Sequence, residues 1–212
     1  MLAYVFWHRP AKPQDADAYE QAQLAFHRSL AHNRPVGMCG SAVFRLTENP
    51  WIAGAEADTG SSTPTAVAPS YEDWYLLEDF AALGVLNEAA VGRGHRSPHD
   101  EVARRYGGGA GGLYALIEGE RKGDLLSGAS VAVWVARPPG SPKRSLADLL
   151  GDGVEPGHAS LWRRALVLGP APEFCLLVRD SAELADASGV AATRLPEGWT
   201  STILQRENLW HG

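Results

Sequence analysis

The chain contains two similar strand-forming segments, residues 3–10 and 131–138, and both end in the dipeptide Arg-Pro. Each segment is rich in β-branched and aromatic residues, which favour strands. Each closes at a proline, which has no N–H group to continue a hydrogen-bonded ladder. This internal similarity is the strongest constraint on the fold, because it indicates that the chain is built from two related halves.

The segments that follow repeat in the same order. Apolar side chains recur at helical spacing in residues 15–33 after the first strand, and residues 141–151 form a shorter helical pattern after the second. Two strands, a helical region and a last strand complete each half. The strands are predicted at 38–46, 71–78 and 113–118, and at 160–168, 174–179 and 199–206. The closing helical regions are predicted at 80–91 with 98–106, and at 181–188. Both halves therefore have the order βαββαβ, which is that of a ferredoxin-like unit.

The two units are assigned to residues 1–124 and 125–212. Residues 47–70 separate the two middle strands of the first unit and are mostly small, polar, glycine or proline. A loop of more than about 15 residues is uncommon in a compact domain and is either functional or disordered. We expect Trp51 and Ile52 to anchor this loop against the folded part of the chain.

Composition excludes several classes of protein. With 45% hydrophobic and 21% charged residues among 212, the chain is typical of a globular protein. Its net charge of -6 provides no broad basic surface, so nucleic acid is not an expected partner. No segment approaches the roughly 18 apolar residues that cross a bilayer, and no signal-peptide pattern is present. We expect a soluble, cytoplasmic protein in which Cys39 and Cys175 remain reduced.

The doubled βαββαβ order, with aromatic residues on its strands, resembles the dimeric α+β barrel superfamily in its duplicated, single-chain form. The resemblance covers nearly the whole chain and rests on topology and the weak internal repeat. It implies an α+β fold in which two ferredoxin-like repeats pack as a pseudo-dimer, with the sheets forming a barrel and the helices outside. Members include small-molecule monooxygenases, muconolactone isomerase-like enzymes, haem-dependent chlorite dismutase-like proteins and regulatory ligand binders. Monomer and homo-oligomer both remain open.

Alternation along the first strand places Tyr4, Phe6 and His8 on one face and Val5 and Trp7 on the other. Aligned on Arg-Pro, the second of these faces corresponds to the aliphatic face of the strand in the second half. We therefore expect Val5 and Trp7 to pack against helices. The opposite face is expected to line a cavity between the two sheets.

His8 is the candidate catalytic residue of this cavity. An imidazole exchanges protons near neutral pH and suits general acid or base catalysis. The alternative is a structural histidine near a strand end. The candidate ligand-binding residues are Tyr4, Phe6, Trp74, Tyr75, Trp134 and Arg45, the last of which either orients a polar group of a ligand or lies exposed at an edge.

Other polar residues are assigned structural roles. The spacing of His95 and His99 suits a metal site on a helix, but Pro98 interrupts it, so no metal is predicted. Arg93, His95 and Arg96 either bind an anion ahead of a helix or form an exposed helical break. We interpret His27 as a packing or surface histidine of the first helix.

Two further patterns resemble cofactor sites without their context. The run Gly107–Gly112 follows a helix and enters a strand, whereas a phosphate loop runs from strand to helix, so the run is predicted to end the helix and turn the chain. Haem binding would need an axial ligand, and the second half offers only His158 and His211. No cofactor is assigned from the sequence.

Two functions remain open. The first is an enzyme that binds a small aromatic or enolic molecule in a barrel cavity, in the manner of a cofactor-independent oxygenase or an isomerase. The second is a noncatalytic ligand-binding or protein-interaction module.

Overall fold

The computed structural model describes residues 1–52, 69–92, 94–119, 126, 128–141, 159–166, 172–178 and 195–212. The first half contains β1 (Leu2–Pro10), a short 3-10 turn (Pro13–Asp15), α1 (Ala16–His32), β2 (Met38–Leu46), β3 (Ser70–Leu77), α2 (Phe80–Val91), α3 (Arg96–Ala103) and β4 (Tyr106–Glu118). The second half contains β5 (Val131–Ala136), β6 (Ala159–Arg164), β7 (Phe174–Val178) and β8 (Thr200–His211).

The eight strands form one closed antiparallel barrel in the order β1-β3-β2-β8-β5-β7-β6-β4. The predicted mixed α+β class is confirmed. Within each half the strands lie in the order fourth, first, third, second. The helices predicted at 141–151 and 181–188 fall almost wholly outside the described residues, so the duplication of a complete ferredoxin-like unit stays a prediction.

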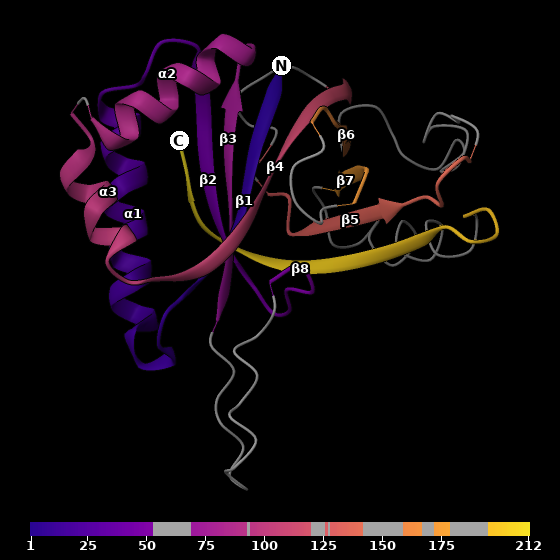
Figure 1. Ribbon diagram of the computed structural model, residues 1–212, viewed down its shortest axis with the longest axis horizontal. Coiled ribbons are helices and arrows are strands. Elements are labelled where there is room, and N and C mark those ends of the chain that lie inside the picture. The colour runs from indigo at the N-terminus through magenta and orange to yellow at the C-terminus, as the bar shows by residue number, and fades with distance from the viewer. Residues whose placement is uncertain are drawn as a thin grey trace, which may run out of the picture.

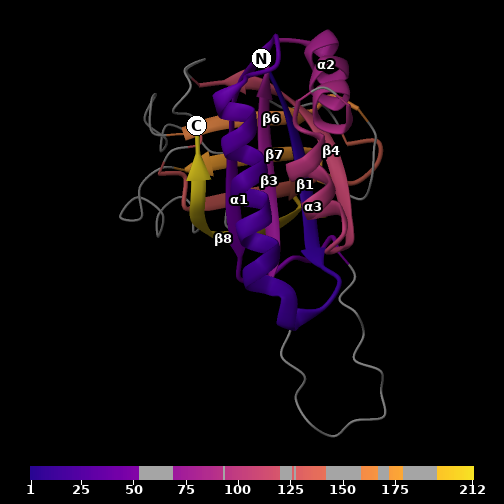
Figure 2. The same ribbon diagram turned by 90° about the vertical axis from the view of Figure 1, so that its left-hand side faces the viewer.

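The helices cover one side of the barrel. All three lie over the sheet of the first half, while the strands of the second half cross behind that sheet at a steep angle (Figures 1 and 2). The break between α2 and α3 occurs where the sequence predicts it. No helix in the described part of the chain is long and apolar enough to span a membrane.

The interior of the barrel is filled by large aromatic side chains. Trp7, Trp74, Trp134 and Trp162 are fully buried. The ring centroids of Trp7 and Trp134 lie 5.0 Å apart, and those of Trp74 and Trp162 lie 5.4 Å apart. Aromatic pairs in such tilted and edge-on contacts contribute packing energy beyond their burial. Trp134 and Trp74 face the barrel interior, but neighbouring side chains occupy the space in which the sequence predicted a ligand.

Two hydrophobic residues at the start of the long loop also pack on this core. Trp51 and Ile52 contact the barrel cluster, and the Trp51 ring lies 5.0 Å from that of Trp7. The prediction that they anchor the loop is confirmed. The rest of the loop falls outside the described residues.

A buried ion pair sits among the tryptophans. The Glu72 carboxylate on β3 accepts hydrogen bonds from Trp7 Nε1 at 2.8 Å, Trp74 Nε1 at 2.6 Å and Arg206 Nη1 at 2.7 Å. The guanidinium of Arg206 lies 3.9 Å from the ring centroid of Phe44. Because Arg206 lies on β8, this pair links strands from the two halves.

The prediction of which face of β1 points into the barrel and which faces the helices is wrong. Val5 and Trp7 belong to the barrel core, whereas Tyr4, Phe6 and His8 face the helices. Aligning the two segments on Arg-Pro placed the two strands one residue out of register. In the structure, Ala132 and Trp134 share the barrel interior with Val5 and Trp7. A slip of one residue exchanges the two faces of a strand.

The glycine run also differs from its prediction. Residues 107–112 lie within β4, and residues 108–112 pair with β1, so the run does not end a helix and turn the chain. A Cβ atom at Gly111 would lie 2.8 Å from the Tyr4 hydroxyl, and one at Gly109 would lie 3.1 Å from Phe6 Cζ. The missing side chains leave room for both rings beside β4.

Candidate functional site

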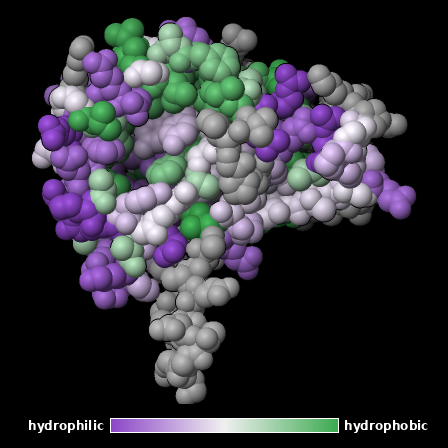
Figure 3. All heavy atoms as spheres, in the orientation of Figure 1, coloured by the Kyte–Doolittle hydropathy of each residue, from purple (hydrophilic) through white to green (hydrophobic). Residues whose placement is uncertain are grey.

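A cavity of about 740 Å³ lies between the sheet of the first half and the three helices. Figure 3 shows the molecule hollowed on this side, beneath the apolar residues that cover α2. The sheet contributes mainly aromatic and polar side chains, and α2 and α3 contribute mainly apolar ones. A cavity of this size suits a small organic molecule.

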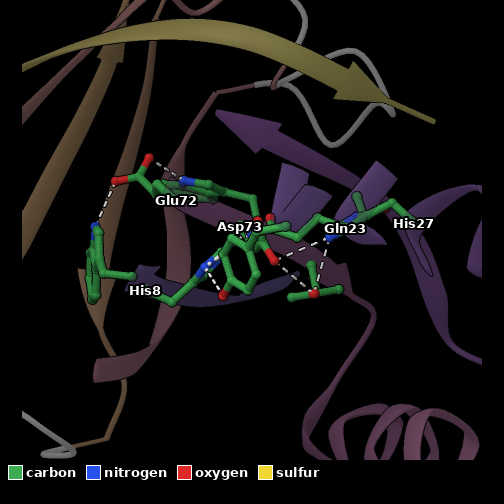
Figure 4. A network of polar contacts seen from close by, with 10 residues as sticks. His8, Gln23, His27, Glu72 and Asp73 are labelled. Carbon is green, nitrogen blue, oxygen red and sulfur yellow. Dashed lines mark hydrogen bonds and ion pairs between the residues drawn. The ribbon is translucent and has the colours of Figure 1, made fainter. Parts of the chain in front are cut away.

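One carboxylate joins two imidazoles at the floor of this cavity. Asp73 Oδ1 lies 3.2 Å from His8 Nε2, and Asp73 Oδ2 lies 3.2 Å from His27 Nε2. The Tyr75 hydroxyl donates a hydrogen bond to Oδ2 at 3.1 Å. All four side chains are buried. Asp73 and Glu72 are consecutive in β3 and therefore point to opposite faces, one to the helices and the other to the barrel interior (Figure 4).

Each imidazole has a hydroxyl partner on its other nitrogen. His8 Nδ1 lies 2.8 Å from the Tyr19 hydroxyl, and His27 Nδ1 lies 2.9 Å from Ser41 Oγ. We assign the tautomers from these partners, because a carboxylate can only accept hydrogen bonds. The Nε2 atoms that face Asp73 carry the protons, so each Nδ1 accepts from its hydroxyl.

Asp73 remains ionised in this environment. Burial alone would raise the pKa of the Asp73 carboxyl. The imidazoles of His8 and His27 outweigh that effect and hold the pKa well below its usual range. The site therefore contains a fixed negative charge beside two proton-accepting rings.

Stacked rings form the floor around His8. The rings of Tyr4 and Phe6 lie 6.2 Å apart with planes 16° from parallel, and those of Phe6 and His8 lie 5.1 Å apart. Tyr106 extends this series, with its ring 6.0 Å from that of Phe6. A surface of nearly parallel rings is suited to a flat, aromatic ligand.

The tyrosines of this chain resist ionisation. Burial raises the pKa of all six, including that of Tyr71 to about 12. Raised values mean that the unfolded chain loses its phenolic protons first, so stability is full below about pH 10 and falls as pH rises above it.

We expect the folded protein at about pH 10 to show little phenolate absorbance in the ultraviolet, whereas the chain unfolded in guanidinium chloride should be about half ionised. A spectrophotometric titration of both states measures the difference. Coincident titration curves would contradict the burial of these tyrosines.

The predicted site residues are divided between two places. Tyr4, Phe6, His8 and Tyr75 line the cavity. Trp74 and Trp134 lie on the opposite side of the sheet in the barrel core. The roles of these residues in ligand binding and catalysis stay predictions.

Arg45 lies apart from the cavity. It forms ion pairs with Glu20 at 2.5 Å and with Glu207 at 2.7 Å, and its side chain is 39% exposed. This position agrees with the surface alternative of the prediction. Arg45 is not among the residues that line the cavity.

Asp73, Tyr19 and Gln23 were not predicted as site residues from the sequence, and His27 was assigned a structural role. A signal was present in β3, where Asp73 alternates with two tyrosines and therefore shares their face. A charged residue between aromatic residues on one face of a buried strand requires partners. The sequence alone did not show that α1 supplies them.

The other candidates have structural contacts. His95 Nδ1 lies 2.7 Å from Ser29 Oγ, and His95 Nε2 lies 3.0 Å from the carbonyl oxygen of Asn33, which ties α3 to the end of α1. Arg93 and His158 fall outside the described residues, and His211 is exposed at the end of β8. Within the described ranges, no group of three or more His, Cys, Asp or Glu side chains could hold a metal ion.

No family model matches the sequence, and no curated protein matches it either. Solved structures with the same fold include a provisionally named monooxygenase from Fusobacterium nucleatum, with 11% identity, a TM-score of 0.63, and coverage of 99% of this chain and 93% of that one. An anthrone oxidase-like protein has 11% identity, a TM-score of 0.51, and coverage of 100% and 92%. A provisionally named chlorite dismutase has 9% identity, a TM-score of 0.56, and coverage of 99% and 96%.

These similarities show the fold alone. They show an α+β barrel fold, which is the fold expected from the sequence. The cavity between sheet and helices, with its buried carboxylate and two imidazoles, is the candidate site of this chain.

Proposed function

We propose that this protein removes a proton from a flat phenolic or enolic molecule bound between the sheet and the helices, and that it acts as a cofactor-independent, oxygenase-like enzyme. The observation that carries the proposal is the contact of His8 with Asp73 on the aromatic floor of the cavity. A carboxylate that fixes the tautomer of an imidazole and stabilises its protonated form is a recurrent arrangement in general base catalysis.

The proton would travel through Tyr19. Because the Tyr19 hydroxyl occupies His8 Nδ1 at 2.8 Å, a ligand reaches the base through the Tyr19 oxygen. The ligand hydroxyl gives its proton to that oxygen while the original Tyr19 proton moves to His8 Nδ1. The products of this step are a ligand anion and an imidazolium beside the Asp73 carboxylate, so total charge is conserved.

The anion can then react with dioxygen. In an enolisable ketone such as anthrone, the methylene carbon is oxidised to a carbonyl group and dioxygen is reduced. One oxygen atom enters the product, and the other leaves as water with the two methylene hydrogens. The names of two structural neighbours, a provisionally named monooxygenase and an anthrone oxidase-like protein, favour this reaction over an isomerase-like return of the proton to carbon.

Oxygen consumption with anthrone tests the proposal. We expect the wild-type protein to raise the rate above the uncatalysed reaction, and His8→Gln to lower the enzymatic rate by about 10²-fold or more, because general base catalysis contributes about 10²–10⁴-fold. His32→Gln, at the exposed end of α1, is the matched control and should keep the wild-type rate. Equal rates for the wild type and His8→Gln would contradict the role of His8.

The second candidate function is noncatalytic binding of the same class of molecule. It is favoured by the burial of His8, which is only 1% exposed and has partners at both ring nitrogens. In that case anthrone or a related ligand would bind and be recovered unchanged. Measuring affinity and turnover on one sample separates the two functions.

We also propose that the barrel is an internal pseudo-dimer of residues 1–124 and 125–212. The shared strand order of the two halves supports it. One chain then supplies both sheets of the barrel, and a monomeric mass in solution by light scattering is compatible with a complete cavity.

A further inference from the structure

The Gln23 side chain in the cavity wall carries a polar atom without a hydrogen-bond partner among the described residues. Gln23 lies on the buried face of α1, is 1% exposed, and lines the cavity. Its amide nitrogen lies 3.3 Å from His8 Nδ1. Its amide oxygen makes no hydrogen bond with any residue in the described part of the chain. A buried acceptor without a partner costs free energy, and such a group needs an explanation.

The orientation of this amide follows from Asp73. The carboxylate places the His8 proton on Nε2, so Nδ1 can only accept. The NH₂ group of Gln23 must then face His8, and the amide oxygen is directed away from it. Asp73 thus determines, through His8, that Gln23 offers the cavity an acceptor rather than a donor.

The neighbouring hydroxyl protons are already used. Tyr19 donates to His8, and Tyr75 donates to Asp73 at 3.1 Å. Neither tyrosine has a second proton with which to satisfy the Gln23 oxygen. A bound molecule that carries its own O–H or N–H group can do so.

We infer that Gln23 is a specificity-determining residue whose amide oxygen accepts a hydrogen bond from the ligand. The cavity then selects flat aromatic molecules that carry a hydrogen-bond donor over equally sized molecules that carry only an acceptor. The inference rests on the proposed function for the existence of a ligand and adds the group by which that ligand is recognised. A site with a fixed polar group rejects an analogue that leaves this group unpaired.

Three naphthalene probes test this selectivity by calorimetric titration. 2-Naphthol and 2-naphthylamine carry a donor, and 2-methoxynaphthalene has nearly the same shape without one. We expect the wild-type protein to bind both donors at least about tenfold more tightly than the ether. The amine is included because it donates without being acidic, which separates hydrogen bonding from proton transfer.

Gln23→Met keeps the length of the side chain and removes the acceptor. We expect the variant to bind the three probes with affinities within about twofold of one another, mainly through weaker binding of the two donors. Gln21→Met, on the exposed face of the same helix, is the matched control and should keep the wild-type preference.

Each outcome distinguishes the inference from the proposed function. Equal affinities of the wild-type protein for naphthol and ether overturn the role of Gln23 without any variant. A preference that survives Gln23→Met also overturns it and assigns recognition to another group. Failure of all three probes to bind the wild type overturns the proposed aromatic-ligand cavity itself, whereas binding without turnover leaves the selectivity intact and contradicts only the catalytic step.

Discussion

Replacing Arg206 by leucine is expected to lower the free energy of unfolding by about 3–5 kcal/mol, the usual cost of breaking a buried ion pair on one side. The side chains of Arg206 and Glu72 are both fully buried in the barrel. Without the guanidinium, the Glu72 carboxylate keeps two indole N–H donors but loses the only positive charge beside it among the described residues. Arg206 Nη2 also donates to the carbonyl oxygen of Ala129 at 2.5 Å, and that bond is lost as well.

Urea denaturation of the wild type and the variant measures this loss. Arg45→Leu is the matched control, because Arg45 also pairs with two carboxylates but does so at the surface. Exposed pairs contribute about 0–1 kcal/mol, so the control should change stability little. Comparable losses in the two variants would show that burial of the Arg206 pair does not determine its contribution.

The strand content of the barrel could be predicted from the sequence because it depends on local features. The first two strands and the break between α2 and α3 carry strong signals: β-branched and aromatic runs, a serine and proline at a helix start, and regular apolar spacing. These signals act over a few residues. They do not depend on what the rest of the chain packs against them.

Which face of each strand points into the barrel depends on packing against residues distant in the sequence. Trp7 and His8 are neighbours in β1, yet Trp7 enters the barrel core and His8 faces α1. Both faces of β1 are rich in large side chains, so alternation alone did not show which face meets the helices. The alignment with β5 decided the question wrongly, because a shift of one residue exchanges the two sides.

The glycines of β4 show a second limit of prediction from local sequence signals. A run of glycines predicts a turn when only the local chain is considered. Here the run pairs with β1, and the absent side chains accommodate the rings of Tyr4 and Phe6. The glycines of β4 are thus explained by the bulky rings of β1, a strand about a hundred residues away. Only the pairing of the two strands shows this relation.

The candidate site could not be predicted from the sequence because it too depends on contacts between distant parts of the chain. Asp73 and His27 are separated along the chain and meet only because α1 packs on the face of β3 that carries Asp73. Glu72, on the other face of the same strand, fixes the barrel core through Trp7 and Arg206. Two consecutive acidic residues therefore serve the two faces of one strand, the first in stability and the second in the proposed chemistry.

Replacing Asp73 by asparagine is expected to lower turnover of an enolic substrate by about 10²–10⁴-fold, because it reverses the tautomer of His8. Tyr75 and His27 both donate to Oδ2, so the asparagine oxygen must occupy that position. Its NH₂ group then faces His8 Nε2, which has to accept. The His8 proton moves to Nδ1, and the ring can no longer receive the proton of Tyr19.

The Asp73→Asn substitution should also change the orientation of the Gln23 amide in the cavity wall. With a proton on Nδ1, His8 can no longer accept a hydrogen bond from the Gln23 NH₂ group, so the amide turns its oxygen to the ring and its NH₂ group to the ligand. Asp73→Asn is therefore expected to lose the preference for naphthol over its methyl ether while still binding naphthalene rings. Nitrogen chemical shifts of the His8 side chain report the tautomer directly, and turnover and probe affinities are measured on the same sample.

Asp79→Asn is the matched control for this prediction. Asp79 caps α2 by accepting a hydrogen bond from the backbone N–H of Ala82 at 2.9 Å, and asparagine is an equally good cap. We expect its turnover and selectivity to equal those of the wild type. If Asp73→Asn keeps turnover within about threefold of the wild type although its His8 tautomer is reversed, the Tyr19–His8 path does not carry the proton, since general base catalysis contributes far more than that.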